Sequence, residues 1–365
     1  MKSDQNNLAF ADSRRSFLQK ASLGALAMTI PFSGLPESLK GVGMGVVVHS
    51  YWTRWQAKTD NAMYPGFKDA VQLMEHCHAI GAGGVQVGVR RWTEDFSKSV
   101  RDTREKLGLY LEGSISLPKS SDEISAFETE VKAAKEAGAT VLRTACLSGR
   151  RYETFGSAAE YLDFKEASIA SIQRAEPIVR KHKVKLAVEN HKDWLSMELV
   201  EIIENLGSEW VGVTLDFGNN VSLLEHPMEV IRNLAPYSFS THVKDMGVKE
   251  YEDGFLLSEV PLGSGIIDLE EAVKLCQSSN KDIRFSLEMI TRDPLKVPCL
   301  SDKYWGTFDA RPASELAQSL KLVRENSFSG SLPSLEGLSE AQKFQNEEMN
   351  ILSSLAFSKK SLRLG

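Results

Sequence analysis

The chain of 365 residues has the composition of a globular protein, with 42% hydrophobic and 25% charged residues. These proportions exclude a disordered or fibrous chain. The formal net charge of −6 argues against a nucleic-acid partner, because such binding requires clustered Lys and Arg. Length alone would allow two domains, although a barrel of repeated strand–helix units often exceeds about 250 residues as one domain.

The N-terminal segment differs from the rest of the chain. Arg14 and Arg15 are followed by Phe17 and by an apolar run over 21–30, an order that resembles a twin-arginine export signal. The run is too short for a bilayer span, which needs roughly 20 apolar residues. We therefore predict that residues 1–40 are an export signal and linker, read by the export machinery, and that the protein is periplasmic or otherwise exported. A basic arm on a cytoplasmic protein is the alternative.

From residue 41 the hydrophobic pattern alternates between two periods. Segments with helical spacing, such as the stripe of Phe67, Val71 and Met74, separate eight apolar runs of strand length. Strands that alternate with helices are joined by parallel crossovers, so the order predicts a (β/α)8 TIM barrel over residues 41–327. A doubly wound sheet is the alternative, although no glycine-rich phosphate turn follows the first run. The predicted strands are 43–50, 84–89, 110–116, 140–146, 184–191, 211–217, 239–246 and 284–290.

Four features depart from the simple repeat. Residues 250–262 predict a loop or hairpin after the seventh strand, and residues 294–305 predict a long loop after the eighth. Both insertions leave the C-terminal ends of strands, the face that carries the active site in such barrels. Pro177 is expected to kink or divide the fourth helix. Residues 328–365 predict a linker and an accessory helix that packs on the barrel or on a neighbouring subunit, so a homo-oligomer stays open.

Four consecutive predicted strands end in ionisable side chains, namely Glu189, Asp216, His242 and Glu288. Neighbouring strand ends share one rim of a barrel, so these side chains are expected to converge. Three carboxylates and an imidazole at one place require a cation between them. The set therefore predicts one divalent metal ion. Mn²⁺ is the first candidate, and Mg²⁺, Co²⁺ and Zn²⁺ are alternatives.

The motifs around these residues resemble the xylose-isomerase-like barrel superfamily, specifically its sugar phosphate isomerase/epimerase branch. The resemblance covers roughly residues 41–325. It implies that Glu189, Asp216, His242 and Glu288 bind the metal, and that Glu189 and Glu288 act as acid and base on opposite sides of the substrate. The strongest matches are Val188-Glu189-Asn190-His191, Leu215-Asp216-Phe217-Gly218, His242-Val243-Lys244-Asp245, Leu287-Glu288 and Pro261-Leu262-Gly263-Ser264-Gly265-Ile266-Ile267-Asp268.

The chain also departs from parts of this family. Many ketose 3-epimerases have a His and an Arg where this sequence has Asn219 and Val248, which weakens the specific epimerase interpretation. The trinuclear endonuclease branch has further His and Asp ligands at the ends of strands two and three. Those ends here are Arg90 and Leu117, so a DNA-repair activity is not expected.

The expected reaction is the isomerisation or epimerisation of a sugar or keto-sugar through an enediolate. A chelated metal acidifies the C–H next to the carbonyl, Glu189 or Glu288 takes the proton, and the opposite Glu returns one. Loss of CO₂ or of a β-hydroxyl would use the same enediolate. A lyase (decarboxylase or dehydratase) of an oxidised sugar or keto-sugar acid is therefore the alternative. A periplasmic carbohydrate-binding barrel is the non-enzymatic alternative, although binding alone does not need paired acid/base groups.

Further side chains at strand ends and on rim loops are candidate contacts to a small carbohydrate substrate. The Arg residues would bind an anionic substrate, and Trp305 would stack on a sugar ring. Surface pairing or packing is the alternative for any one of them, and Lys244 has Asp245 as an equal candidate partner. The candidates are His49, Arg90, Arg143, His191, Lys244, Arg292 and Trp305.

Overall fold

The computed structural model describes residues 41–364 except 42, 60 and 309. The described residues belong to one compact unit, Pro36–Gly365. The predicted export signal at 1–40 lies outside them. No helix in this part of the chain combines the length and the apolar character that a membrane crossing requires.

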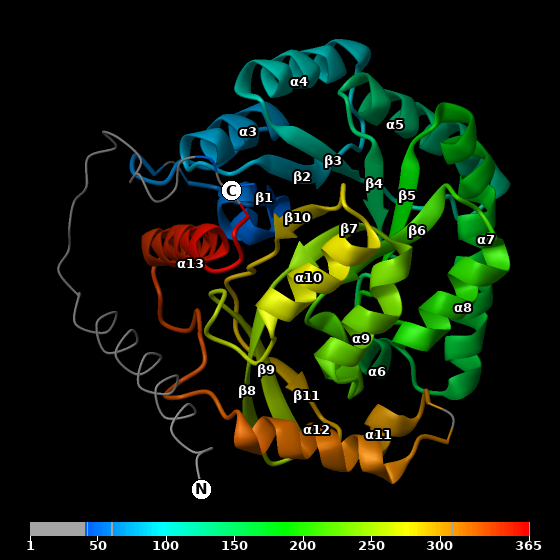
Figure 1. The fold of residues 1–365 in the computed structure, drawn as a ribbon, viewed down its shortest axis with the longest axis vertical. Helices are drawn as coiled ribbons and strands as arrows, with labels where there is room; N and C mark the ends of the chain where they lie inside the picture. The colour runs from blue at the N-terminus through cyan, green and yellow to red at the C-terminus, as the bar shows by residue number, and fades with distance from the viewer. Residues whose placement is uncertain (1–40, 42, 60, 309, 365) are drawn as a thin grey trace, which may run out of the picture. The chain divides into compact units, whose positions relative to one another are not determined.

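Eight parallel strands close into a barrel, which confirms the predicted TIM-barrel fold (Figure 1). Each strand pairs with the next one in the barrel, and β1 pairs with β10, so the barrel sheet has no free edge. Every residue of β6 is buried, as expected for strands covered by helices. The barrel strands are β1 (Gly45–Val47), β2 (Gly84–Gly88), β3 (Tyr110–Ser114), β4 (Val141–Thr144), β5 (Lys185–Glu189), β6 (Val211–Asp216), β7 (Ser238–Val243) and β10 (Arg284–Leu287).

Helices surround these strands in Figure 1. Several begin at a polar side chain that accepts a hydrogen bond from the helix backbone, such as Asp69, Thr93 and Ser157. The main helices are α3 (Ala70–Ala79), α4 (Glu94–Leu107), α5 (Ile124–Glu136), α7 (Ala158–His182), α8 (Ser196–Leu206), α9 (Pro227–Leu234), α10 (Leu269–Ser279) and α12 (Ala313–Glu325). The last of these packs on the inserted strands β8 and β9, described below.

Of the two effects predicted for Pro177, a kink or a division of the fourth helix, the division is wrong. Helix α7 runs through Pro177 without interruption. It packs on α5 and β5, and Ala175, Ile178 and Val179 beside the proline are buried. This packing offsets the backbone hydrogen bond that the proline removes.

The first predicted strand, 43–50, is longer than the observed one. After β1 the chain enters a 3₁₀ helix, η2 (Val48–Tyr51), which leads into the short helix α2 (Trp52–Trp55). Val48 and Tyr51 are buried in η2, so the apolar pattern continues past the end of the strand. This rim segment carries His49.

The two predicted insertions form a small antiparallel sheet. Strands β8 (Asp245–Tyr251) and β9 (Gly254–Val260) make the hairpin predicted at 250–262. The segment 294–305 is not only a loop, because it contains β11 (Leu295–Val297), which pairs with β9, and α11 (Asp302–Trp305). The start of the hairpin is fixed by Asp245, whose carboxylate accepts backbone N–H groups from the returning segment 263–267.

The C-terminal accessory helix, α13 (Glu340–Lys360), packs on its own barrel. Ser339 and Gln342 form a capping box at its start. Phe344, Ile351 and Leu355 are fully buried, and the helix contacts η2, α2 and β10. It therefore supports the rim of the barrel next to His49.

A buried ion pair joins α13 to this rim, and its loss is expected to destabilise the protein. Arg54 Nη1 lies 2.6 Å from Glu348 Oε2, and both side chains are buried. Glu348→Gln leaves the guanidinium without its counter-charge, so the free energy of unfolding should fall by about 2 kcal/mol. Urea denaturation measures the change. Glu94→Gln, in the exposed pair with Lys98, is the control and should have no measurable effect. Equal losses in both variants would contradict the prediction.

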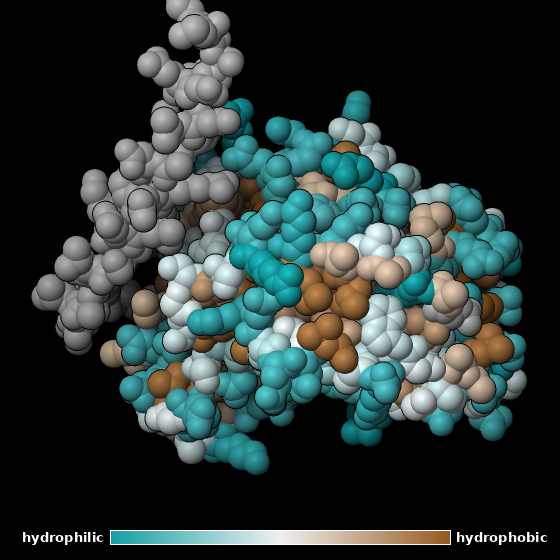
Figure 2. All heavy atoms as spheres, turned by 90° about the horizontal axis from the view of Figure 1, so that it is seen from below, coloured by the Kyte–Doolittle hydropathy of each residue, from teal (hydrophilic) through white to brown (hydrophobic). Residues whose placement is uncertain are grey.

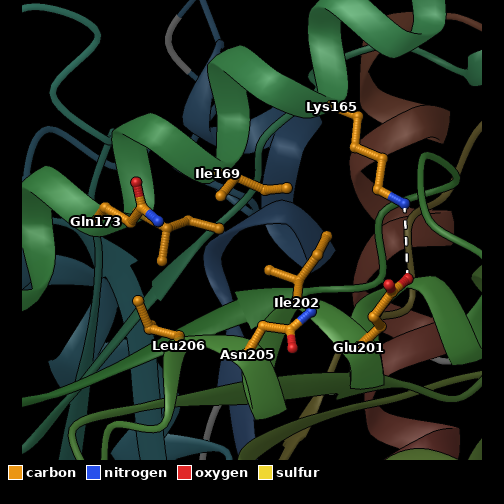
Figure 3. Close-up of a pocket in the computed structure, with 8 residues that line it drawn as sticks. Lys165, Ile169, Gln173, Glu201, Ile202, Asn205 and Leu206 are labelled. Carbon is orange, nitrogen blue, oxygen red and sulfur yellow. Dashed lines mark ion pairs between the residues drawn. The ribbon is translucent and has the colours of Figure 1, made fainter.

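The cavity described on the outer surface contains none of the predicted functional residues. Figure 2 shows one face, on which hydrophilic residues predominate and apolar residues form small patches. A cavity of about 150 Å³ lies between α7 and α8, lined by Ile169, Gln173 and Ile202 among others (Figure 3). Lys165 and Glu201 form an ion pair at its edge, with 3.8 Å between Nζ and Oε2. None of the candidate site residues lines this cavity.

Candidate metal centre

Four neighbouring strands bring Glu189, Asp216, His242 and Glu288 together, and we call these residues the quartet. Glu189 and Asp216 end β5 and β6, His242 lies in β7, and Glu288 follows β10. One candidate ligand atom from each residue lies within 4.8 Å of those of the other three, and all four residues are buried. The barrel thus places the predicted ligand set around one point.

The unpartnered nitrogen of His242 fits a cation at this point. Its Nδ1 lies 3.6 Å from Glu189 Oε1, 3.8 Å from Asp216 Oδ2 and 3.4 Å from Glu288 Oε2. This nitrogen has no hydrogen-bond partner in the described part of the chain. The other ring nitrogen, Nε2, lies 2.8 Å from Gln86 Oε1, so Nδ1 stays turned towards the carboxylates. Three carboxylates and one imidazole nitrogen suit Mn²⁺, Mg²⁺ or Co²⁺, so the residues present fit a divalent ion.

Each glutamate of the quartet uses one oxygen for an outer partner and turns the other inwards. Glu189 Oε2 accepts from Arg143 Nε at 2.5 Å, while Oε1 faces His242. Glu288 Oε1 lies 3.0 Å from His49 Nδ1, while Oε2 faces His242. Arg143 and His49 therefore fix the orientation of the two carboxylates.

Lys244 pairs with the quartet and not with Asp245. Its Nζ lies 2.8 Å from Asp216 Oδ2 and 2.7 Å from Glu288 Oε2. Both are oxygens that also face His242. Burial lowers the pKa of Lys244, but Asp216 and Glu288 outweigh that effect and raise the pKa overall. The ammonium is therefore a permanent positive charge inside the site.

Burial and ion pairing act in opposite directions on the carboxyl groups. Burial would raise the pKa of Glu189, but Arg143 and His242 outweigh it and hold the pKa well below its usual range. For Glu288, burial is outweighed by Lys244 and His242, and the pKa again lies well below its usual range. Both glutamates are therefore ionised at neutral pH.

The pKa of His242 is shifted in the opposite direction to those of the two glutamates. Burial would lower its pKa, but Glu288 and Glu189 outweigh that effect and raise the pKa to about 10. Without a metal, the imidazole is therefore protonated and supplies part of the positive charge that the carboxylates need. A metal ion that binds Nδ1 must displace this proton, so metal binding should release protons.

Among the remaining predicted contacts, His191 and Arg292 each interact with an acidic side chain, whereas Arg90 and Trp305 have no ion pair with the quartet. His191 is close enough to Glu189 to interact with it, and burial lowers its pKa to about 3, so it is neutral. Arg292 Nε lies 3.0 Å from Glu259 Oε2 on β9. Arg90 is exposed and has no ion pair with the quartet, because the chain leaves β2 at Gly88 before reaching it. The Trp305 indole donates to the Cys299 carbonyl, and its ring lies against Tyr304 and Phe308.

Sequence reasoning missed several polar residues near the quartet. Gln86 and Glu112 lie inside the barrel in the middle of β2 and β3, where Gln86 Nε2 donates to Glu112 Oε2 at 2.9 Å. Polar side chains within otherwise buried strands were the available signal. Lys192 and Glu259 carried no such signal, because their neighbours come from other elements.

Gln86→Leu is expected to weaken metal binding about tenfold or more, because the His242 ring loses the acceptor that orients it. Titration calorimetry with MnCl₂ measures the dissociation constant. Gln173→Leu, in the outer cavity of Figure 3, is the control and should bind Mn²⁺ as the wild type does. An unchanged dissociation constant for Gln86→Leu would show that other contacts hold the ring.

Comparisons with known proteins point to the same fold. The model of the xylose isomerase-like TIM barrel family matches residues 74–325. The 3-oxo-isoapionate decarboxylase of Pectobacterium atrosepticum is 23% identical over 252 residues, which cover 67% of this chain and 85% of that enzyme. The family match spans all four residues of the quartet.

Two solved structures show the likeness in three dimensions. A D-psicose 3-epimerase, determined in the presence of D-fructose, aligns with a TM-score of 0.56 at 15% identity and covers 87% of this chain and 99% of its own. A xylose isomerase-like TIM barrel protein from Mycobacterium smegmatis, in complex with magnesium, aligns with a TM-score of 0.52 at 16% identity. That alignment covers 78% of this chain and 100% of the other. At these identities the likeness is evidence for the fold alone.

Proposed function

Because this chain belongs to the xylose isomerase-like TIM barrel family, we propose that it is a divalent-metal-dependent isomerase or epimerase of a sugar or keto-sugar. The observation that carries the proposal is the buried quartet, in which two glutamates stand beside a place that fits one divalent ion. Such an ion, with Mn²⁺ as the first candidate, would polarise the substrate carbonyl and stabilise the negative charge of the enediolate.

Glu189 and Glu288 are the acid and base in this proposal. Both are ionised, so either one can accept the proton from the carbon next to the carbonyl. The opposite one first takes up a proton from solvent and then transfers it to the enediolate. Return to the same carbon on the other face gives epimerisation, and return to the next carbon gives isomerisation. His49 is 32% exposed and touches Glu288, so it connects this carboxylate with solvent.

A lyase is the second candidate function. It is favoured by the similarity to the decarboxylase, which extends over 85% of that enzyme. In a decarboxylation the bond between the α-carbon and the carboxylate breaks, the electron pair stays on the carbon as an enediolate, and CO₂ leaves. Glu189 or Glu288, carrying a proton, would then protonate that carbon.

Solvent isotope exchange separates these candidates. Mn²⁺-loaded protein is incubated in D₂O with a panel of ketoses, 3-keto-sugars and keto-sugar acids, and the products are analysed by NMR. Deuterium in recovered or isomerised sugar supports the isomerase or epimerase, whereas released CO₂ or water supports the lyase. If neither occurs, and Glu189→Gln does not alter carbohydrate binding, the non-enzymatic binding barrel replaces both. Failure to retain any divalent ion after reconstitution would reject the metal.

We also propose that the protein is exported, on the strength of Arg14, Arg15 and the apolar run after them. Changing both residues by Arg14→Lys and Arg15→Lys is expected to keep the protein in the cytoplasm, because the export machinery reads the paired arginines. Cell fractionation and immunoblotting measure the distribution. A wild-type protein found only in the cytoplasm would contradict the proposal.

A further inference from the structure

Lys192 is a buried ammonium group without a carboxylate partner. It follows β5 by three residues, is 4% exposed, and its Nζ donates to Asn219 Oδ1. Within the described chain, no Asp or Glu oxygen lies at ion-pair distance from this Nζ, although two cations nearby are paired. Lys244 has Asp216 and Glu288, and Arg292 has Glu259.

Two features of Lys192 are unfavourable in the protein alone. A buried charge without a counter-charge loses its hydration and regains little. Burial, together with the positive charges of Lys244 and Arg292, outweighs the more distant Glu259 and Asp216 and lowers the pKa of Lys192 to about 8. The residue also has φ of 72°, in the left-handed region that non-glycine residues rarely adopt. Backbone strain of this kind is concentrated at functional sites.

Asn219 connects Lys192 to the quartet. Its Oδ1 accepts from Lys192 and lies 3.4 Å from Lys244 Nζ, while its Nδ2 donates to Glu189 Oε1 at 3.0 Å. Lys192 Nζ is thus separated from the acid/base pair by one side chain. A negative group on a substrate held at the quartet would supply the counter-charge that Lys192 lacks.

We propose that Lys192 binds a carboxylate of the substrate, so that the substrate is a sugar acid with an oxo group and not a neutral sugar. The inference rests on the proposed function, because it takes the quartet as the place where the carbonyl end binds. One unpaired ammonium matches the single charge of a carboxylate. A phosphate ester, with a charge of about −1.5 to −2, requires more positive charge than Lys192 offers, because Lys244 and Arg292 are already paired.

Matched acids and neutral sugars test this proposal. Hydroxypyruvate and dihydroxyacetone, 2-keto-D-gluconate and D-fructose, and 5-keto-D-gluconate and L-sorbose differ within each pair only by carboxylate against hydroxymethyl. Titration calorimetry with Mn²⁺-loaded protein is expected to show at least one acid binding about 30-fold more tightly than its neutral partner, a ratio typical of a buried charge pair. L-Sorbose 6-phosphate, which carries phosphate in place of the carboxylate of 5-keto-D-gluconate, should bind less tightly than that acid.

Two variants remove the ammonium in different ways. Lys192→Met removes the charge and keeps the length of the side chain, whereas Lys192→Gly also suits the left-handed backbone. Both should lose the preference for the acid and retain the Mn²⁺ affinity. Without sugar, the melting temperature of Lys192→Met should rise by about 2 °C or more, since an unpaired buried charge is gone. Lys165→Met, in the outer ion pair of Figure 3, is the matched control and should retain the acid preference.

The proposal is overturned if no acid binds more tightly than its neutral partner, or if the preference persists in both Lys192 variants. Tighter binding of the phosphate, lost in the same variants, would also overturn it and assign the site to phosphate esters. An acid that binds through Lys192 without isotope exchange or CO₂ release would reject the enzymatic function and leave the carboxylate site intact. Isotope exchange on neutral ketoses that Lys192→Met does not alter would support the enzymatic function and reject the carboxylate site.

Discussion

Glu288→Gln is expected to lower turnover about 1,000-fold or more, and Glu189→Gln is expected to do the same. Glutamine retains the shape of the side chain and a hydrogen bond to His49 or Arg143, but it neither accepts a proton nor supplies an anionic ligand. Deuterium incorporation into the substrate identified from the panel measures the rate. At Mn²⁺ concentrations that saturate each variant, the remaining loss isolates proton transfer from metal binding.

Glu201→Gln provides the matched control for these two variants. Glu201 lies on α8 in the outer helical layer, where it pairs with Lys165 (Figure 3). Its removal should leave turnover and Mn²⁺ affinity at wild-type levels. If Glu288→Gln and Glu189→Gln both retain more than about a tenth of the wild-type rate when saturated with Mn²⁺, the acid/base roles are wrong, because a single general acid or base contributes about 100-fold or more.

The barrel was predictable because each strand and each helix has its own hydrophobic pattern in the local sequence, and this pattern repeats along the chain. Each run such as 211–217 is mainly apolar, and the helices between the runs have their own period, so the order of elements predicts a parallel barrel. Strand ends were less predictable. At 48–51 the chain stays buried but leaves the strand for a 3₁₀ helix, and an apolar pattern does not distinguish the two. Strand β11 was missed because its partner β9 is distant in sequence.

The convergence of the quartet was predictable from topology, whereas the contacts around it were not. Neighbouring parallel strands end at one rim, whichever side chains they carry. Arg143 and Arg90 show the limit of this reasoning. Arg143 lies within β4 and turns inwards to Glu189, while Arg90 lies two residues beyond the end of β2 and is exposed. Because successive strand residues alternate in direction, a shift of one residue decides which arginine reaches the site.

The surroundings of Lys192 and Lys244 depend on contacts between distant segments. Glu259 lies on β9 of the β8–β9 hairpin and pairs with Arg292, so Lys192 has no carboxylate at ion-pair distance within the described residues. In the sequence alone, Lys244 has Asp245 beside it as the obvious partner. In the structure the Asp245 carboxylate accepts hydrogen bonds from the backbone N–H groups of Gly263 and Gly265. Lys244 therefore pairs with the quartet.

Lys244→Met is expected to destabilise the metal-free protein by about 3–5 kcal/mol, because Asp216 and Glu288 then lose the ammonium that balances them in a buried site. Saturating Mn²⁺ should restore most of this loss. The ion would contact the quartet oxygens that Lys244 occupies, and a ligand that binds only the folded state stabilises it. Urea denaturation with EDTA and with MnCl₂ measures the two free energies of unfolding.

Comparing the stability loss of Lys244→Met with and without Mn²⁺ shows whether Lys244 and the metal ion balance the same negative charges or whether Lys244 has a separate structural role. Lys98→Met, on the exposed surface of α4, is the control and should give a small change that is the same in both conditions. If Lys244→Met costs the same stability with and without Mn²⁺, the ammonium acts as a tie between strands that the metal does not replace. If the loss is confined to the metal-free protein, Lys244 and the ion neutralise the same oxygens, as the distances from its Nζ to Asp216 and Glu288 require.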